Sequence, residues 1–245
     1  MKRKKKGKYD FSSLSIDQAG VGAEVCIRTA KRMIEGAQNL SKGGYSELAT
    51  FLVCAAIEET GKAMLLLHFQ EGKHSGKQSA IEDLEEGFGR HMDKLEIAWR
   101  YWKWDEKLFT RIKRLQPGLK TGREMADAFT RLTDGIKLPN LVPIAKQTFR
   151  KRNNMLYTEY ERGKFVAPQQ RVRRRTFNQL LAVAEQSNAK ANLERVMSQI
   201  WFRRGLSRAQ VATKLSPHLP EFFEEMLKKL QNIPYKVDTT KPAKP

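Results

Sequence analysis

Three side chains that suit contact with a phosphodiester lie close together in the middle of the chain. Arg152 and Asn153 are adjacent, and Tyr157 lies roughly one helical turn further along. A guanidinium stabilises charge on non-bridging oxygens, while an amide and a phenol donate hydrogen bonds. Tyrosine is a poor general base at neutral pH, because its unperturbed pKa is about 10. The stretch predicts a phosphodiester site, and the alternative is a structural arginine with Tyr157 capping the core.

A carboxylate in an apolar helical stripe is a candidate partner for this arginine. In residues 45–68, helical spacing places Glu59 on the apolar face, with Glu58 and Lys62 flanking it. The face consists of Leu48, Leu52, Ala55, Ala56, Ala63, Leu66 and Leu67. An unpaired polar group there would cost on the order of 2–7 kcal/mol, so Glu59 needs a cation or donors from another helix. We expect Arg152, in a pair that either orients a functional residue or only locks the helix register.

One of the four histidines is a candidate for proton transfer. His91 lies in the segment Arg90-His91-Met92-Asp93-Lys94-Leu95. An imidazole titrates near neutrality and is therefore suited to acid–base catalysis. The alternative is a structural histidine on a mixed helix face.

Basic side chains are concentrated between residues 146 and 175. This stretch contains ten basic residues but only two acidic ones, Glu159 and Glu161. Tyr157, Tyr160 and Phe165 are interleaved with the basic residues. Basic residues with interleaved aromatics bind phosphates and stack bases. We predict nucleic-acid binding by Lys146, Arg150, Lys151, Arg171, Arg173, Arg174 and Arg175. The alternative is a solvated helix face.

The composition of the whole chain agrees with a polyanionic partner. Among 245 residues, 46 Lys and Arg stand against 27 Asp and Glu, a net charge of +19. This excess favours RNA, DNA or an anionic membrane surface. The alternative is a basic surface without a specific partner.

The sequence predicts neither a metal site nor a cofactor. It contains no CxxC pair, and the four histidines show no ligand spacing. No apolar run approaches the roughly 18 residues of a membrane span, and no hydrophobic region follows the basic N-terminus. We therefore expect a cytoplasmic protein.

The hydrophobic pattern is helical almost throughout. We expect helices at about 15–40, 45–70, 79–104, 122–133, 143–160, 171–204 and 207–231. The first two are long and joined by a short turn at residues 42–44, which is typical of the αα-hairpin of a bundle.

Taken together, these stretches resemble the AbiV family of abortive infection proteins, a phage-defence family of the HEPN class. The resemblance covers roughly residues 17–168. Residues 55–63, Ala-Ala-Ile-Glu-Glu-Thr-Gly-Lys-Ala, are similar to the family's apolar-Glu-Glu-x-Gly-Lys-Ala signature. The segment from His91 to Leu95 is similar to its His-x-x-Lys-Leu stretch. Arg152-Asn153 followed by Leu156-Tyr157, ahead of Pro168, is similar to its Arg-x-x-x-Leu-Tyr stretch.

The resemblance implies an all-α, HEPN-like helical bundle with long antiparallel helices, usually a dimer. In this chain we expect extra C-terminal helices after that bundle. The expected parts are a disordered basic arm at 1–12, the AbiV/HEPN-like domain at 13–168, a basic helical extension at 169–233 and a disordered tail at 234–245.

HEPN ribonucleases carry an arginine, a polar residue and, four residues after that polar residue, a histidine, and two protomers combine them in one cleft. Arg152 and Asn153 match the first two, and Tyr157 occupies the place of the histidine. Metal-independent RNA cleavage then requires that His91 or Tyr157 substitutes for it; otherwise the chain binds without cutting. The residues expected to organise the site are Glu58, Glu59, Lys62 and Lys94.

The expected function is a phage-defence effector that acts on RNA or translation in the infected cell, by RNA cleavage or binding. The alternative is a non-enzymatic helical interaction protein that binds a phage or host protein. The expected partners are RNA and a second copy of the chain, with a phage-encoded protein as a further candidate.

Overall fold

The computed structural model describes residues 10–115, 140–155, 159–161, 164–166 and 174–203. Its elements are α1 (Ile16–Lys42), α2 (Ser46–His74), α3 (Ala80–Gly89), α4 (His91–Leu115), α6 (Val142–Asn154), β1 (Glu159–Glu161), β2 (Lys164–Val166) and α7 (Arg174–Arg203). Two compact units are present: Met1–Glu106 with Lys137–Leu206, and Lys107–Ile136 with Ser207–Pro245. The predicted all-α fold with long antiparallel helices is confirmed, and everything described below concerns the first unit.

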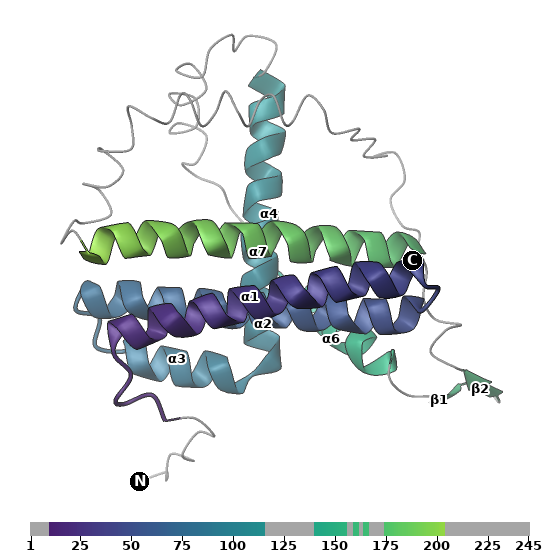
Figure 1. The fold of residues 1–245 in the computed structure, drawn as a ribbon, viewed down its shortest axis with the longest axis horizontal. Coiled ribbons are helices and arrows are strands. Elements are labelled where there is room, and N and C mark those ends of the chain that lie inside the picture. Colours follow the sequence, from purple (N-terminus) through teal and green to yellow (C-terminus); the bar gives the residue numbers. More distant parts are fainter. Residues whose placement is uncertain (1–9, 116–139, 156–158, 162–163, 167–173, 204–245) are drawn as a thin grey trace. The chain divides into compact units, whose positions relative to one another are not determined.

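The first two helices form the predicted αα-hairpin (Figure 1). Ser15 caps α1 through a capping box with Gln18. Gly44, in the turn, has a φ of 86°, a backbone conformation that favours glycine. The amide of Gln70 donates to the carbonyl of Ile16 at 2.6 Å, which joins the far end of α2 to the start of α1. Small residues on α1 let the two helices pack closely; its buried face consists of Ala19, Gly20, Ala23, Ile27, Ala30, Ile34 and Ala37.

Helix α2 is the centre of the unit, because α1, α3, α6 and α7 all pack against it. Its residues belong to two separate apolar clusters. The first contains Ala49, Val53, Cys54, Ala56 and Ile57, and the second contains Ala63, Met64, Leu66, Leu67 and Phe69. The intervening residues 58–62, Glu-Glu-Thr-Gly-Lys, therefore form a polar step in the middle of the core.

The single helix predicted at 79–104 is wrong, because the chain breaks between α3 and α4. Arg90 has extended backbone angles, φ −110° and ψ 120°. The ammonium of Lys94 donates to the carbonyl of Phe88 at 3.1 Å and so satisfies a carbonyl near the end of α3. The break turns α4 away from α3 (Figure 1) and places His91 at the first position of α4.

Further along the chain, the predicted boundaries differ from the structure in several places. Helix α2 runs to His74 rather than ending near residue 70. Helix α6 ends at Asn154, and Tyr160, expected in the same helix, pairs with Phe165 in an antiparallel hairpin of β1 and β2. Aromatic and β-branched residues favour strands, which agrees with this hairpin. The predicted helices at 122–133 and 207–231, the basic arm up to residue 9 and the C-terminal tail lie outside the described residues.

Helix α7 packs along α1 and α2 in the same compact unit. Its Phe177, Leu180, Val183 and Ala184 join the first apolar cluster. Two polar contacts fix its direction: Gln38 donates to Glu185 at 2.7 Å, and Arg195 pairs with Glu24 at 3.2 Å. Of the described helices, none is long and apolar enough to cross a membrane.

The approach of α4 to α2 depends on a glycine. A Cβ added at Gly61 would lie 1.9 Å from the carbonyl oxygen of Lys94, so any larger residue collides with the backbone of α4. Only a hydrogen at this position lets the start of α4 reach the polar step of α2.

We predict that Gly61→Ala lowers the free energy of unfolding by about 3 kcal/mol, the upper part of the range for overpacked cores. Gly89→Ala, at the end of α3, is the matched control, because nothing lies within 4 Å of an added Cβ there. It should change stability by less than about 1 kcal/mol. Urea unfolding followed by circular dichroism measures both, and equal stability of the two variants would contradict the steric argument.

Candidate functional site

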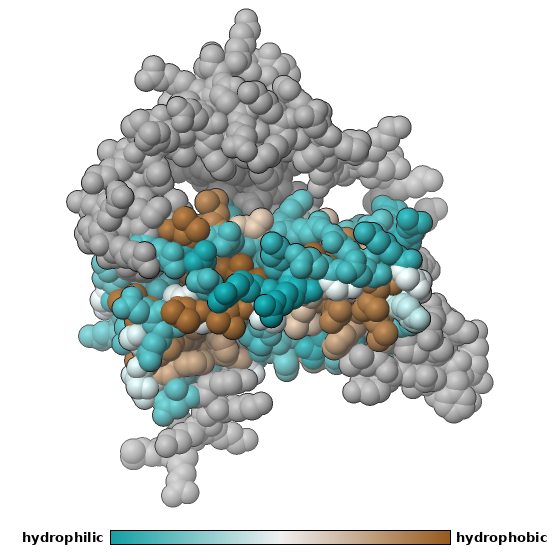
Figure 2. All heavy atoms as spheres, viewed as in Figure 1, coloured by the Kyte–Doolittle hydropathy of each residue, from teal (hydrophilic) through white to brown (hydrophobic). Residues whose placement is uncertain are grey.

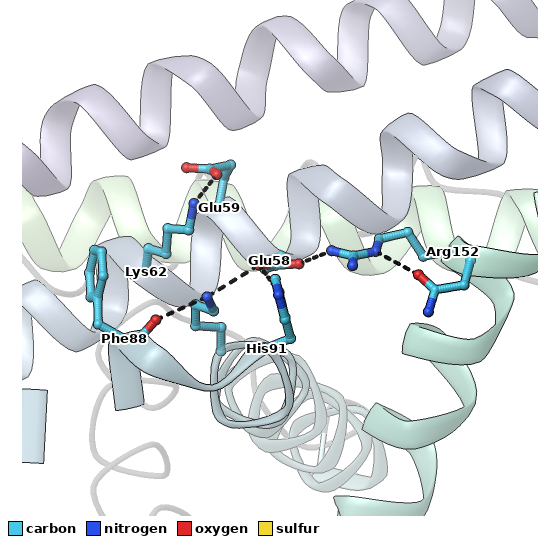
Figure 3. A network of polar contacts seen from close by, with 8 residues as sticks. Glu58, Glu59, Lys62, Phe88, His91 and Arg152 are labelled. Atoms are coloured by element: carbon cyan, nitrogen blue, oxygen red, sulfur yellow. Dashed lines mark hydrogen bonds and ion pairs between the residues drawn. The ribbon is translucent and has the colours of Figure 1, made fainter. Parts of the chain in front are cut away.

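A buried carboxylate in the polar step of α2 joins three basic side chains. The side chain of Glu58 is only 8% exposed. Its Oε1 lies 2.6 Å from Nδ1 of His91 and 3.3 Å from Nζ of Lys94, both on α4. Its Oε2 accepts from Nη1 of Arg152, on α6, at 2.5 Å. Figure 3 shows Glu58 between His91 and Arg152, so one carboxylate connects α2, α4 and α6.

Helix α4 supplies two of these partners because His91 and Lys94 are three residues apart and share a helix face. Their environments differ. The side chain of Lys94 is 4% exposed, and its ammonium is shared between Glu58 and the carbonyl of Phe88. The side chain of His91 is 51% exposed, so its ring lies at the boundary between the buried carboxylate and solvent.

Helix α6 brings Arg152 to the same carboxylate from the other side. The helix is fixed on α4 by a hydrogen bond of 3.0 Å from Trp99 Nε1 to Thr148 Oγ1, and Arg152 lies four residues after Thr148, on the same face. The Arg152 guanidinium stacks over the ring of Phe149, with Cζ 5.0 Å from its centroid. Its Nε donates to Asn153 Oδ1 at 3.4 Å.

The ring of Phe149 is also a neighbour of His91, with centroids 5.6 Å apart. One aromatic side chain therefore contacts both the imidazole and the guanidinium. No signal in the sequence marked Phe149 as a support for these two groups.

The three basic groups keep Glu58 ionised. Burial alone raises the pKa of this carboxyl group, but the hydrogen bond from His91 and the charges of His91, Lys94 and Arg152 outweigh burial and hold the pKa below its ordinary range. A carboxyl group that is more acidic when folded stabilises the fold fully above its unfolded pKa of about 4.3. That stabilisation is lost as the pH falls through the lowered folded pKa.

The predicted pairing of Glu59 with Arg152 is wrong; Glu58 is the partner. Glu59 instead pairs with Lys62, three residues along the same helix, and both side chains are only partly buried. They lie beside Cys26 of α1, whose thiol has its pKa raised to about 12 by burial and by the Glu59 charge, so the thiol stays protonated. The physical reason for the error is that α2 is covered from several sides, so its apolar stripe does not point at α6.

The structure thus brings together Glu58, His91, Lys94, Arg152 and Asn153, and it separates the Glu59–Lys62 pair from them. Among the predicted nucleic-acid-binding residues, Lys146, Arg150, Arg174 and Arg175 are exposed and Lys151 is half-buried. Tyr157, Arg171 and Arg173 lie outside the described residues. In the described part of the chain, no group of three or more His, Cys, Asp or Glu residues could hold a metal ion.

A protein-family model matches most of this unit. Residues 18–189 match the family model HEPN_AbiV, described as AbiV. The chain belongs to the AbiV family. Neither the curated proteins nor the solved structures contain a match to this chain.

The match assigns this AbiV chain to a family of abortive infection proteins. The matched residues include all three segments of the site. The geometry explains why the three segments occur together. In the signature of residues 55–63, Glu58 provides the carboxylate and Gly61 admits the backbone of α4. The His-x-x-Lys spacing provides His91 and Lys94 on one face, and the third segment provides Arg152.

Replacing Glu58 should be far more damaging than replacing its neighbour. Glu58→Gln leaves two cations facing an uncharged group, one of them the buried Lys94, and we expect a loss of about 3–5 kcal/mol in the free energy of unfolding. Glu59→Gln is the matched control, since it removes a charge from a partly exposed pair that is worth at most about 1 kcal/mol. Chemical denaturation at neutral pH measures both, and an equal loss in the two variants would show that Glu58 does not hold the core.

Proposed function

We propose that this AbiV-family chain is a phage-defence effector that acts on RNA in the cytoplasm of the infected cell. One observation carries the proposal: the single carboxylate of Glu58 is shared among three basic groups. It neutralises one positive charge, while Lys94 and Arg152 together bring two. The site therefore keeps a net positive charge, which favours an anion such as a phosphodiester.

The excess charge lies where a ligand can reach it. His91 is half-exposed and Arg152 is partly exposed, whereas Lys94 is buried. In the described part of the chain, Arg152 bonds to Glu58 through Nη1, and a guanidinium has five N–H donors. In this proposal, Arg152 binds a phosphate oxygen and Asn153 positions it.

Exposed basic side chains on two helices support the same proposal. Lys146 and Arg150 are exposed on α6, the helix that carries Arg152, and Arg174 and Arg175 are exposed at the start of α7. These exposed charges attract a chain of phosphates whatever its base sequence.

We also propose that the chain acts as a homodimer through its α1–α2 hairpin. The resemblance to the HEPN class, whose members are usually dimers, supports the proposal, and Val21 and Val25 on α1 and Leu48 on α2 are exposed apolar side chains of this hairpin. Figure 2 shows apolar side chains among hydrophilic ones on one face of the molecule. The mass in solution, measured by light scattering at micromolar concentration, tests this proposal, and a monomer mass would reject it.

The second candidate function is a non-enzymatic interaction protein of the same fold that binds a phage or host protein. Tyr157, in the place of the HEPN motif histidine, favours it. In that case the pair between Glu58 and Arg152 has only a structural role.

We expect Arg152→Ala to abolish protection of cells against phage. The change removes the group that binds phosphate and also uncouples α6 from Glu58. Arg152→Lys should restore little, because an ammonium lacks the planar fork of the guanidinium. Tyr157→Phe deletes only a hydroxyl and should retain more protection than Arg152→Ala.

Plaque counts on cells with matched expression levels measure these effects. Circular dichroism of each purified variant shows whether it is folded. Full protection by a folded Arg152→Ala protein would reject the proposed site in favour of the interaction protein.

RNA binding should weaken steeply with salt and should require the start of α7. If about five phosphates are neutralised on single-stranded RNA, the slope of log affinity against log salt should be near −3.5. Reversing Arg174 and Arg175 to Glu should make the slope shallower and leave the fold intact, since acidic residues are favourable at a helix N-terminus.

The matched control reverses Arg28 and Lys31 to Glu, two exposed basic residues of α1 outside the basic stretch. It changes the net charge by the same amount. Fluorescence anisotropy with a labelled oligoribonucleotide measures all three proteins, and equal weakening by both double variants would show that only net charge matters.

A further inference from the structure

The position normally taken by a histidine in the HEPN motif is Tyr157 here, but the structure places another histidine at the same arginine. His91 and Arg152 bond to the two different oxygens of one carboxylate, Oε1 and Oε2 of Glu58. They come from different helices, α4 and α6, and are therefore neighbours only in the folded chain. A phosphate held by Arg152 would bring its own ribose close to the His91 ring.

The contact with Glu58 determines which ring nitrogen of His91 can act as a base. An ionised carboxylate only accepts hydrogen bonds, so the Nδ1 that lies 2.6 Å from it must carry a proton. In a neutral imidazole the proton on Nδ1 leaves the lone pair on Nε2. Nε2 is thus the basic nitrogen, on a ring that is half-exposed to solvent.

The same carboxylate and its surroundings hold the ring in place. Lys94 contacts the same Glu58 oxygen as His91, and Arg152 binds the other oxygen, so both oxygens of the carboxylate are held. The ring of Phe149 packs against the imidazole. A base that is oriented by a buried carboxylate, next to a cation that binds the phosphate, is an arrangement suited to general acid–base catalysis.

We infer that His91 is the catalytic base of an RNA-cleaving site and that Glu58 is its positioning residue; this inference rests on the proposed function. The substrate class is RNA with a free 2′-hydroxyl. Nε2 of His91 takes the proton of the 2′-hydroxyl as O2′ forms a bond to phosphorus. The bond from phosphorus to O5′ breaks, and O5′ takes a proton from water. The imidazolium returns its proton to the resulting hydroxide, which leaves a 2′,3′-cyclic phosphate and a 5′-hydroxyl.

The test compares the purified full-length protein with His91→Ala on a labelled single-stranded oligoribonucleotide and on its 2′-O-methyl counterpart. His91→Ala should lower kcat by about 10²-fold or more while KM changes little. Added imidazole should restore part of the lost kcat in His91→Ala, which a purely structural histidine would not allow. The 2′-O-methyl substrate should be bound but not cut. His68→Ala, which also replaces an exposed histidine, is the matched control and should retain activity.

Glu58→Gln tests the positioning role. In the presence of His91 it should lower kcat, whereas in the His91→Ala background it should cause little further loss of kcat. Any remaining effect, exerted through Arg152, should appear in KM. Independent losses in the two backgrounds would reject a role of Glu58 through His91.

The outcomes separate this inference from the proposed function. RNA that is bound with salt-dependent affinity but never cut overturns the inference and leaves RNA binding in place. Cleavage that survives in His91→Ala also overturns the inference. So does cleavage that is lost in His91→Ala without imidazole rescue and is lost in Tyr157→Phe as well, because the base then lies elsewhere. A protein that neither binds nor cuts RNA overturns both proposals.

Discussion

The site depends on one electrostatic constraint, a buried carboxylate that is ionised only because three basic side chains surround it. Glu58 would cost several kcal/mol if it were buried alone. His91, Lys94 and Arg152 offset that cost, and in doing so they fix the start of α4 and the end of α6 against the middle of α2. The attraction is mutual, because Lys94 is also buried and would lose its ion pair without Glu58.

Backbone packing holds this cluster of charged side chains together and connects it to α3. Gly61 lets α4 approach α2, and the ammonium of Lys94 holds the carbonyl of Phe88. The ring of Phe88 in turn packs on Phe11 at 5.1 Å, and the backbone of Phe11 donates to Glu85 at 3.2 Å. The chain that precedes α1 is therefore connected to the site through α3.

Much of the fold follows from the sequence, because the helical periodicity and the turn at residues 42–44 are local signals. The sequence also suggested that Arg152 pairs with a carboxylate of α2, but that carboxylate is Glu58, and Glu59 pairs with Lys62 on its own helix. The choice between Glu58 and Glu59 did not. Adjacent residues on a helix differ by about 100°, and the periodicity of α2 cannot distinguish them because four other helices cover it.

Gly87 and Gly89 weaken the predicted helix just before Arg90, but the position of the break could not be predicted for a related reason. The residue itself is neither glycine nor proline, and the break is held by contacts with α2 that are far away in the sequence. The convergence of His91 and Arg152 on one carboxylate depends on that break. The resemblance named both residues, and only the folded structure shows that they meet.

The central role of the buried Glu58 carboxylate is tested most directly by a pair of double-mutant cycles on folding stability. One cycle combines Glu58→Gln with Arg152→Met, and the other combines Glu59→Gln with the same Arg152→Met. We predict a coupling energy of about 1–3 kcal/mol between Glu58 and Arg152, and less than about 0.5 kcal/mol between Glu59 and Arg152. No coupling for Glu58, or a larger coupling for Glu59, would contradict the central role of the buried carboxylate.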